Sequence, residues 1–132
     1  MNDQQIEKQI VAKGKTAPRV TPSRVEAIIR SEHYFTAYDG RRGALANETY
    51  EAREKPLDAD ADLAPLQLLT FCVLVLENGF TVTGESACAS PENFDAVIGR
   101  NIARQNAVNK IWLLEGYLLK QRLFEHQKCW GA

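Results

Sequence analysis

Residues 66–95 of the chain read LQLLTFCVLVLENGFTVTGESACASPENFD. Two strand-like runs flank Asn78-Gly79, and both of these residues tolerate the positive φ that a type I′ turn requires. Asn-Gly between two such runs is the strongest short-range signal for a β-hairpin. We therefore predict an antiparallel hairpin centred on this dipeptide, with the other elements packed around it.

A two-residue turn fixes the register of this hairpin, and it would pair Val75 with Val82 and Val73 with Gly84. Side chains alternate between the two faces of a strand. The predicted core face therefore carries Phe71, Val73, Val75, Phe80 and Val82. The opposite face is half polar, which suits a groove or a contact between subunits.

Ser90-Pro91 ends the second strand and predicts the start of a helix, because serine caps helices and proline suits the first helical position. Apolar side chains continue at helical spacing to about Phe124. One helix of this length would exceed the usual size in a globular domain. We therefore expect a break between Gln105 and Asn109, or a bend at Gly116.

The N-terminal part of the chain predicts shorter elements. Residues 1–20 are expected to form an arm or a short helix. Thr21-Pro22 repeats the cap-and-proline signal and predicts a helix to about Glu32. The aromatic segment from His33 to Tyr38 either extends this helix or forms a short strand. Residues 39–65 are charged and contain glycine and proline, which predicts a long loop or flap.

These elements together predict an α+β fold. An antiparallel hairpin or small sheet packs against C-terminal helices, and an additional helix lies towards the N-terminus. With 132 residues, of which 45% are hydrophobic, the chain has the size of one domain with a modest core. We expect this domain to span residues 21–132 and the arm to span residues 1–20.

Charge and cysteine content limit the possible partners. With 16 basic and 17 acidic residues the net charge is -1, which argues against a general nucleic-acid binder. The three cysteines are an odd number without Cys-x-x-Cys spacing, and the N-terminus lacks a signal peptide, so we expect a cytoplasmic location. The longest apolar run is too short to cross a bilayer, so no membrane partner is expected.

No motif predicts catalysis or metal binding. Asp58, Asp60 and Asp62 have the spacing of calcium ligands, but Leu63 replaces the glycine of such a loop and Leu69 replaces its closing glutamate. The histidines and cysteines lack the paired spacing of a zinc site, and no cysteine has a local partner that would activate it. We expect no catalytic residue, no metal, no cofactor and no enzymatic activity.

The most plausible ligand site combines arginines with aromatic rings. Arg100 and Arg104 lie one turn apart on an edge of the predicted C-terminal helix. Arginine binds phosphate, helix amides favour anions, and a ring stacks on a base. The candidate ligand-binding residues are Arg100, Arg104, Phe80, Thr81, Thr83, Asn93 and Phe94. Alternatively, the arginines are solvated or paired with a nearby carboxylate, and both phenylalanines belong to the core.

The segment from Leu69 to Leu118 resembles a small family of phage proteins typified by early products of short-tailed enterobacterial phages. The resemblance rests on residues 71–95 and on the later Asn109-Lys-Ile-Trp and Glu115-Gly-Tyr motifs. Residues 31–37, which read SEHYFTA, extend it towards the N-terminus. This family is similar to the first class of Thoeris anti-defence proteins, which phages use as sponges for immune signals.

The resemblance implies a function. Proteins of that class sequester glycocyclic ADP-ribose made by bacterial TIR-domain enzymes without cleaving it, and some are hexamers that also hold cyclic trinucleotides. By this resemblance we expect a homo-oligomer, a dimer or a hexamer, that binds a cyclic nucleotide signal in the cytoplasm of the infected bacterial host.

Two alternatives remain from the sequence. The first is a phage protein that inhibits or redirects a host protein, for which exposed Trp112, Tyr117 or Trp130 would be the sign. The second is an enzyme that degrades a nucleotide, which would release an altered ligand.

Overall fold

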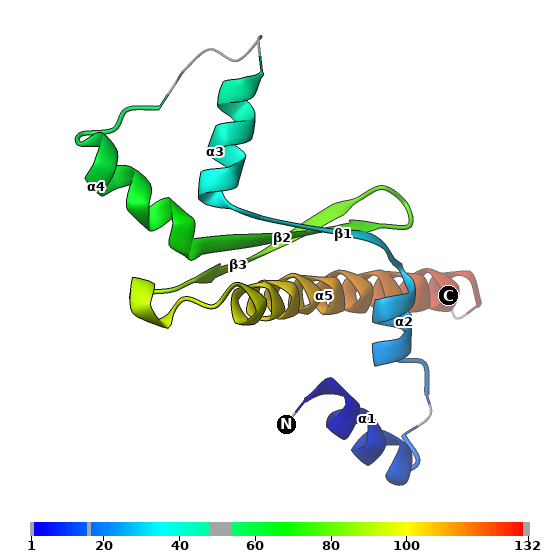
Figure 1. The fold of residues 1–132 in the computed structure, drawn as a ribbon. Coiled ribbons are helices and arrows are strands. Elements are labelled where there is room, and N and C mark those ends of the chain that lie inside the picture. Colours follow the sequence, from blue (N-terminus) through cyan, green and yellow to red (C-terminus); the bar gives the residue numbers. More distant parts are fainter. Residues whose placement is uncertain (1, 16, 48–53, 131–132) are drawn as a thin grey trace.

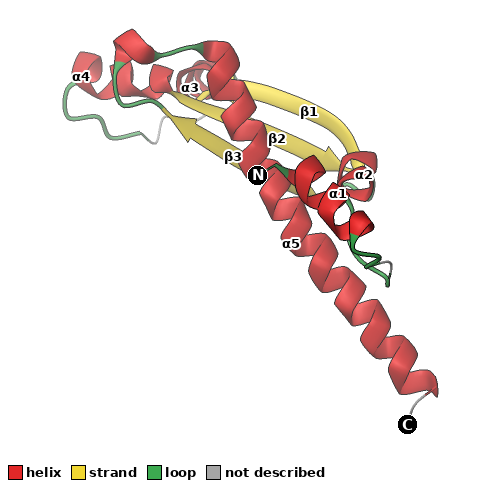
Figure 2. Ribbon diagram, turned by 90° about the horizontal axis from the view of Figure 1, so that it is seen from below, coloured by secondary structure: helices red, strands yellow, loops and turns green. Residues whose placement is uncertain are grey.

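A three-stranded antiparallel sheet forms the centre of the protein, in the order β1-β2-β3, and one long helix lies along a face of it (Figures 1 and 2). The structure, a computed structural model, describes residues 2–15, 17–47 and 54–130. The predicted α+β fold is confirmed. In chain order the elements are α1 (Asp3–Ala12), α2 (Pro22–Ala27), β1 (Ile29–Thr36), α3 (Ala37–Ala46), α4 (Ala59–Leu63), the 3-10 helix η1 (Ala64–Leu68), β2 (Leu69–Leu76), β3 (Thr81–Ala87), the 3-10 helix η2 (Pro91–Asn93) and α5 (Ala96–Trp130).

The β2–β3 hairpin turns at the predicted dipeptide, but through three residues instead of two. Leu76 N donates to Phe80 O at 2.8 Å, and Gly79 N donates to Leu76 O at 2.9 Å. Gly79 has a φ of 87°, whereas no described residue other than glycine, Asn78 included, has a positive φ. This is the geometry of a type I turn followed by a glycine bulge.

The third turn residue shifts the pairing by one position, so the predicted register is wrong. Val75 pairs with Thr81, and Leu74 pairs with Val82. A shift of one residue exchanges the two faces of a strand. The predicted core face of β2 is therefore the outer face, and the buried side chains of the hairpin are those of Thr70, Cys72, Leu74, Leu76 and Val82. Phe80, also predicted to be in the core, is 56% exposed.

α5 approaches β3 very closely at a seam of small residues. Ala103 and Ala107 are fully buried. A Cβ atom placed on Gly84 would lie 2.1 Å from Ala103 O and 2.3 Å from Ala107 N, so only glycine fits. The core around this seam consists of Val25, Ile28, Cys72, Leu74, Leu76, Val82, Val108 and Ile111.

α5 is one uninterrupted helix of 35 residues, so the predicted break at residues 105–109 or bend at Gly116 is wrong. Residues 105–109 contain neither glycine nor proline, and Ala107 and Val108 are buried while the three polar side chains are exposed, as in a continuous amphipathic helix. In the part of the chain that the structure describes, no helix, α5 included, is long and apolar enough to cross a membrane.

The start of α5 differs from the prediction. Ser90-Pro91 begins η2, a 3-10 helix of three residues. Asp95 then caps α5, and its Oδ1 accepts hydrogen bonds from Val97 N at 2.9 Å and Ile98 N at 3.0 Å. The chain therefore bends between the two helices before it returns across the sheet.

β1 occupies part of the segment predicted as helix. α2 ends at Ala27, and β1 runs from Ile29 to Thr36, so the helix does not reach Glu32. Of the two alternatives for the segment that begins at His33, the strand is observed as far as Thr36, and it pairs antiparallel with β2.

Residues 39–65, predicted as a long loop, contain helical structure. α3 starts with a capping box in which Thr36 Oγ1 accepts from Asp39 N and Asp39 Oδ2 accepts from Thr36 N, both at 3.1 Å. α3 and α4 rise from one end of the sheet, on the side away from α5 (Figure 1). Residues 48–53 of the predicted loop lie outside the described residues.

α1 lies within the predicted N-terminal arm and is only loosely attached. Asn2 and Gln5 form a capping box at its start, and none of its side chains is buried. Trp112 Nε1 donates to Asp3 Oδ2 at 3.0 Å, which joins α1 to α5. Arg19 pairs with Glu7 and joins α1 to the segment before α2.

Candidate functional site

Arg100 lies beside aromatic side chains at the end of the sheet from which α3 rises. It follows the Asp95 cap on the second turn of α5 and lines an open hollow of about 130 Å³. The hollow is lined by Tyr34, Phe35, Thr36, Asp39, Thr70, Phe94, Ala96 and Arg100. The structure thus brings two predicted site residues, Arg100 and Phe94, together. Asn93 is exposed in η2 and does not line the hollow.

The hollow combines a cation, aromatic rings and a helix N-terminus. Within the described residues, no carboxylate lies within ion-pair distance of Arg100. Phe35 packs against Phe71 with ring centroids 5.7 Å apart, which fixes one wall. Asp39 already caps the N-terminus of α3, and its hydrogen bonds to Thr36 lower its pKa. Arg100 therefore supplies the positive charge that is available to a ligand.

The size of the hollow limits what it can hold on one chain. Pockets that enclose whole small molecules have volumes of roughly 300–1,000 Å³. The Arg100 hollow, at about 130 Å³, is smaller than this range. It suits a fragment such as a phosphoryl group or one ring.

Arg104 lies one turn further along α5, and two carboxylates occupy its guanidinium. Glu26 of α2 accepts from Nη1 at 3.1 Å and from Nη2 at 2.8 Å. Glu32 of β1 accepts from Nε at 3.1 Å and from Nη2 at 3.2 Å. The hydrogen bonds that Arg104 donates to Glu26 and Glu32 raise the pKa of Arg104, and its hydrogen bonds to Glu32 lower the pKa of Glu32.

Tyr34 extends this network towards the core. Its hydroxyl donates to Glu32 Oε1 at 2.6 Å. Burial, followed by this hydrogen bond to Glu32, raises the pKa of Tyr34, so the phenol stays protonated at neutral pH. Tyr34 also lines the hollow beside Arg100, so the hollow and the Arg104 network share a wall.

The other predicted site residues lie away from the hollow. Phe80 is at the hairpin tip, the end of β2 opposite to the one that meets the hollow. Thr81 and Thr83 alternate with buried positions of β3, so they face away from α5. Thr83 Oγ1 lies 3.4 Å from Lys110 Nζ, which reaches around the sheet edge. The seven predicted residues therefore do not form one site on a single chain.

A cavity of about 410 Å³ opens at the hairpin tip beside Phe80. Arg24 and Arg122 line it, and neither was predicted from the sequence as a ligand-binding residue. Arg24 lies 3.4 Å from Glu77 and 3.6 Å from Glu115, so the charges there are largely balanced. Helical periodicity could have indicated Arg122. It lies 18 positions after Arg104, which is five full helical turns, so both side chains lie on the same side of α5.

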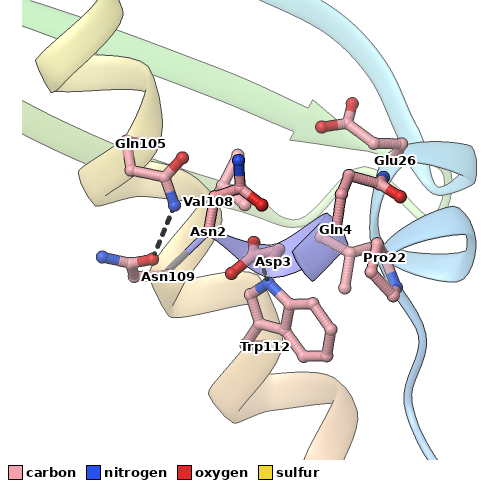
Figure 3. Close-up of a pocket in the computed structure, with 10 residues that line it drawn as sticks. Asn2, Asp3, Gln4, Pro22, Glu26, Gln105, Val108, Asn109 and Trp112 are labelled. Carbon is pink, nitrogen blue, oxygen red and sulfur yellow. Dashed lines mark hydrogen bonds between the residues drawn. The ribbon is translucent and has the colours of Figure 1, made fainter. Parts of the chain in front are cut away.

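A third cavity, of about 590 Å³, lies between α1, α2 and α5 (Figure 3). Trp112 and Asp3 meet in it through their hydrogen bond, and Gln105 Nε2 donates to Asn109 Oδ1 at 2.9 Å. No arginine or lysine among the described residues lines it. This cavity therefore offers amides and carboxylates, which do not suit a phosphate-bearing ligand.

Metal ligands do not gather in the described ranges. Among residues 2–15, 17–47 and 54–130, no group of three or more histidine, cysteine, aspartate or glutamate side chains is arranged to hold a metal ion.

Comparison with known protein families places most of the chain in a family model. Residues 20–123 match the family model described as Phage protein (N4 Gp49/phage Sf6 gene 66) family. The match contains the sheet, the hollow and most of α5, and it leaves out α1. No curated protein and no solved structure matched the chain.

Proposed function

Because the chain belongs to the N4 Gp49/phage Sf6 gene 66 family of phage proteins, we propose that it binds and sequesters a cyclic nucleotide signal of bacterial defence without cleaving it. The proposed ligand is glycocyclic ADP-ribose, with cyclic trinucleotides as a second class. Such a protein would lower the concentration of the free messenger in the infected bacterium.

The hollow at Arg100 is the observation that carries this proposal. A cyclic nucleotide signal presents phosphates and a flat base. Arg100 offers paired donors to a phosphate oxygen, and the neighbouring Phe94 and Phe35 offer rings to a base. The absence of an ion pair at Arg100, within the described chain, leaves this cation available.

The proposal also requires a second wall. A whole messenger extends beyond a hollow of about 130 Å³, and a ligand that is mostly open to water is not held tightly. A second copy of the chain is the proposed source of this wall. The exposed apolar side chains of α5, Leu113 and Tyr117 among them, support self-association.

Calorimetric titration with glycocyclic ADP-ribose tests the proposal. We expect heat of binding for the natural chain, and Arg100→Ala should weaken binding by about 1.5–3 kcal/mol because a charge-assisted hydrogen bond is lost. Arg122→Ala is the matched control, since it removes the same charge from the same helix near the hairpin tip. A titration without heat would refute the proposal, and an effect of Arg122→Ala alone would move the ligand to the hairpin-tip cavity.

Sequestration without cleavage is tested separately. The complex is denatured by heat, and the released small molecule is identified by mass spectrometry. Recovery of intact messenger is the expected result. Recovery of a shortened or opened molecule would instead identify the protein as a nucleotide-degrading enzyme.

A second candidate function is a phage protein that binds and redirects a host protein. Tyr117, which is 74% exposed on α5, favours it. Trp112 is half-buried and bonded to Asp3, and the side chain of Trp130 lies outside the described residues. Capture of one host protein by the natural chain, lost in Tyr117→Glu while messenger binding persists, would support this alternative.

A further inference from the structure

Arg100 and Arg104 point to the same edge of the sheet but differ in their partners. Residues four apart on a helix have Cβ atoms about 5–6 Å apart, which one ligand of nucleotide size can span. Arg100 has no ion pair within the described residues, whereas all three guanidinium nitrogens of Arg104 donate to carboxylates. One arginine of the pair is thus available and the other is masked.

The two carboxylates that mask Arg104 are not held equally. Glu32 also accepts the hydroxyl of Tyr34 at 2.6 Å, and its side chain is 37% exposed. Glu26 contacts Arg104 through both of its oxygens, and its side chain is 52% exposed. An exposed carboxylate is rehydrated when it leaves its partner, so its ion pair contributes little net stability. Glu26 is therefore the partner that is released more easily.

The way Glu26 binds Arg104 is also the way a phosphate would bind. Two oxygens of one group accept from two guanidinium nitrogens, which is the bidentate geometry that arginine forms with carboxylates and phosphates alike. Two carboxylates around one guanidinium also leave the cluster with a net negative charge, which opposes an anion approaching Arg100.

We infer that Glu26 is a built-in competitor of the ligand: it occupies Arg104 in the free protein, and an anionic ligand seated at Arg100 takes its place. This inference rests on the proposed function and names what regulates affinity at that site. Glu26 is a positioning residue here, because it acts through Arg104. Affinity is then the balance between the Glu26 pair and the ligand's phosphate.

The test is a titration of Glu26→Gln with two probes, glycocyclic ADP-ribose and inorganic pyrophosphate, at one pH and one salt concentration. Removing the competing charge should tighten binding of both probes by up to about fivefold, the change that corresponds to the upper end of the strength of one surface ion pair. Glu77→Gln is the matched control. It removes the same charge from Arg24 at the hairpin tip, and we expect less than about a twofold change in affinity because such distant charges are screened.

Two further measurements distinguish a Glu26 that competes with the ligand from a Glu26 that only stabilises the fold. Glu26→Gln should leave the midpoint of thermal unfolding unchanged or slightly lower while affinity rises, whereas damage to the fold would lower both. In an Arg104→Ala background, Glu26→Gln should no longer release an arginine to the ligand, so any remaining gain in affinity comes from weaker charge repulsion alone and should disappear at high salt.

Unchanged or weaker binding by Glu26→Gln would overturn the inference. If the natural chain binds glycocyclic ADP-ribose and Glu26→Gln does not bind it more tightly, the competitor is refuted and the proposed function stands. If neither protein binds either probe, the proposed function fails and the inference fails with it.

Discussion

The two halves of α5 belong to one continuous helix but differ in how closely they pack against the sheet. In the first half, Ala103, Ala107 and Ile111 are fully buried against the sheet. In the second half, Leu113 is 77% exposed and Tyr117 is 74% exposed, and this half extends past the sheet (Figure 2). The fold of a single chain therefore depends on the first half, and the apolar side chains of the second half are available for association.

The largest effect should come from the seam under the first half. Gly84→Ala places a Cβ atom against Ala103 O and Ala107 N, which are backbone atoms and cannot move independently. We expect a loss of at least about 3 kcal/mol in the free energy of unfolding, the upper end of the usual cost of overpacking. Unfolding in urea, followed by circular dichroism, measures it.

Gly116→Ala is the matched control in the second half. No described atom outside the helix's own backbone lies within 4 Å of a Cβ at Gly116. Alanine forms helices better than glycine, so this variant should gain about 0.5–1 kcal/mol. Similar effects of the two substitutions would contradict the assignment of the seam to the first half alone.

A pair of large side chains two positions apart sharpens the same comparison. Ile111→Ala should cost about 3 kcal/mol in stability, because it leaves a cavity in the core. Leu113→Ala should change stability by less than about 0.5 kcal/mol, because the side chain is mostly exposed in the single chain. Both are measured by urea unfolding of dilute protein, and an equal cost would show that Leu113 is covered in solution.

Self-association tests the second half directly. If its apolar side chains form a contact between copies, Tyr117→Glu should weaken association by about 2 kcal/mol or more, as loss of a buried aromatic side chain does. Analytical ultracentrifugation of the natural chain and the variant measures this change. If the natural chain sediments as a monomer at all concentrations, the second half of α5 does not mediate self-association.

The smallest effect concerns pH and the network that ties α2 and β1 to the first half. The hydrogen bond from Arg104, followed by that from Tyr34, lowers the folded-state pKa of Glu32 below its ordinary value of 4.5. A lowered carboxyl pKa stabilises the fold above the unfolded pKa, and this stabilisation is lost as the pH falls through the folded pKa. Because Glu32 is partly exposed, we expect less than about 1 kcal/mol.

Comparison of the natural chain with Glu32→Gln measures this contribution. The difference in unfolding free energy should be present at about pH 7 and should shrink as the pH falls below 4.5 and through the lowered folded-state pKa of Glu32, below which both chains carry a neutral group at this position. A difference that grows on acidification would have the wrong sign for this network.

The hairpin shows how far sequence patterns reach. Asn78-Gly79 located the turn, but the pattern does not distinguish a turn with two residues of positive φ from one in which only Gly79 has it. The two faces of β2 were assigned wrongly for a second reason. Both its odd and its even positions are mainly apolar, so hydrophobicity did not indicate which face was buried.

Other elements were predicted only in part. β1 is an edge strand with several exposed polar side chains, and its pattern overlaps with that of a helix extension. The start of α3 did carry a local signal, Thr36 followed three positions later by Asp39, although the glycines of this helix suggested a loop. α5 continues past the expected break because the sheet supports residues 105–109.

At the candidate site, the sequence correctly placed Arg100 and Arg104 one turn apart on α5. The sequence did not predict that the two arginines have different partners. Glu26 and Glu32 are 78 and 72 positions away from Arg104, and only the packing of α2 and β1 on α5 brings them there. Phe80 and Phe94 are close in sequence, but the sheet separates them because one lies at each end of it.

The hairpin turn also affects the chemical ageing of the protein. Asn-Gly is the dipeptide most prone to deamidation, in which the glycine amide nitrogen attacks the asparagine side-chain carbonyl to form a succinimide. Here Gly79 N donates to Leu76 O, so the attacking nitrogen is engaged while the hairpin is closed, and the hydrogen bond from Phe80 N to Asn78 Oδ1 at 2.9 Å holds the side chain in one position. Accumulation of an acidic species on isoelectric focusing during storage would therefore report how often this hairpin opens.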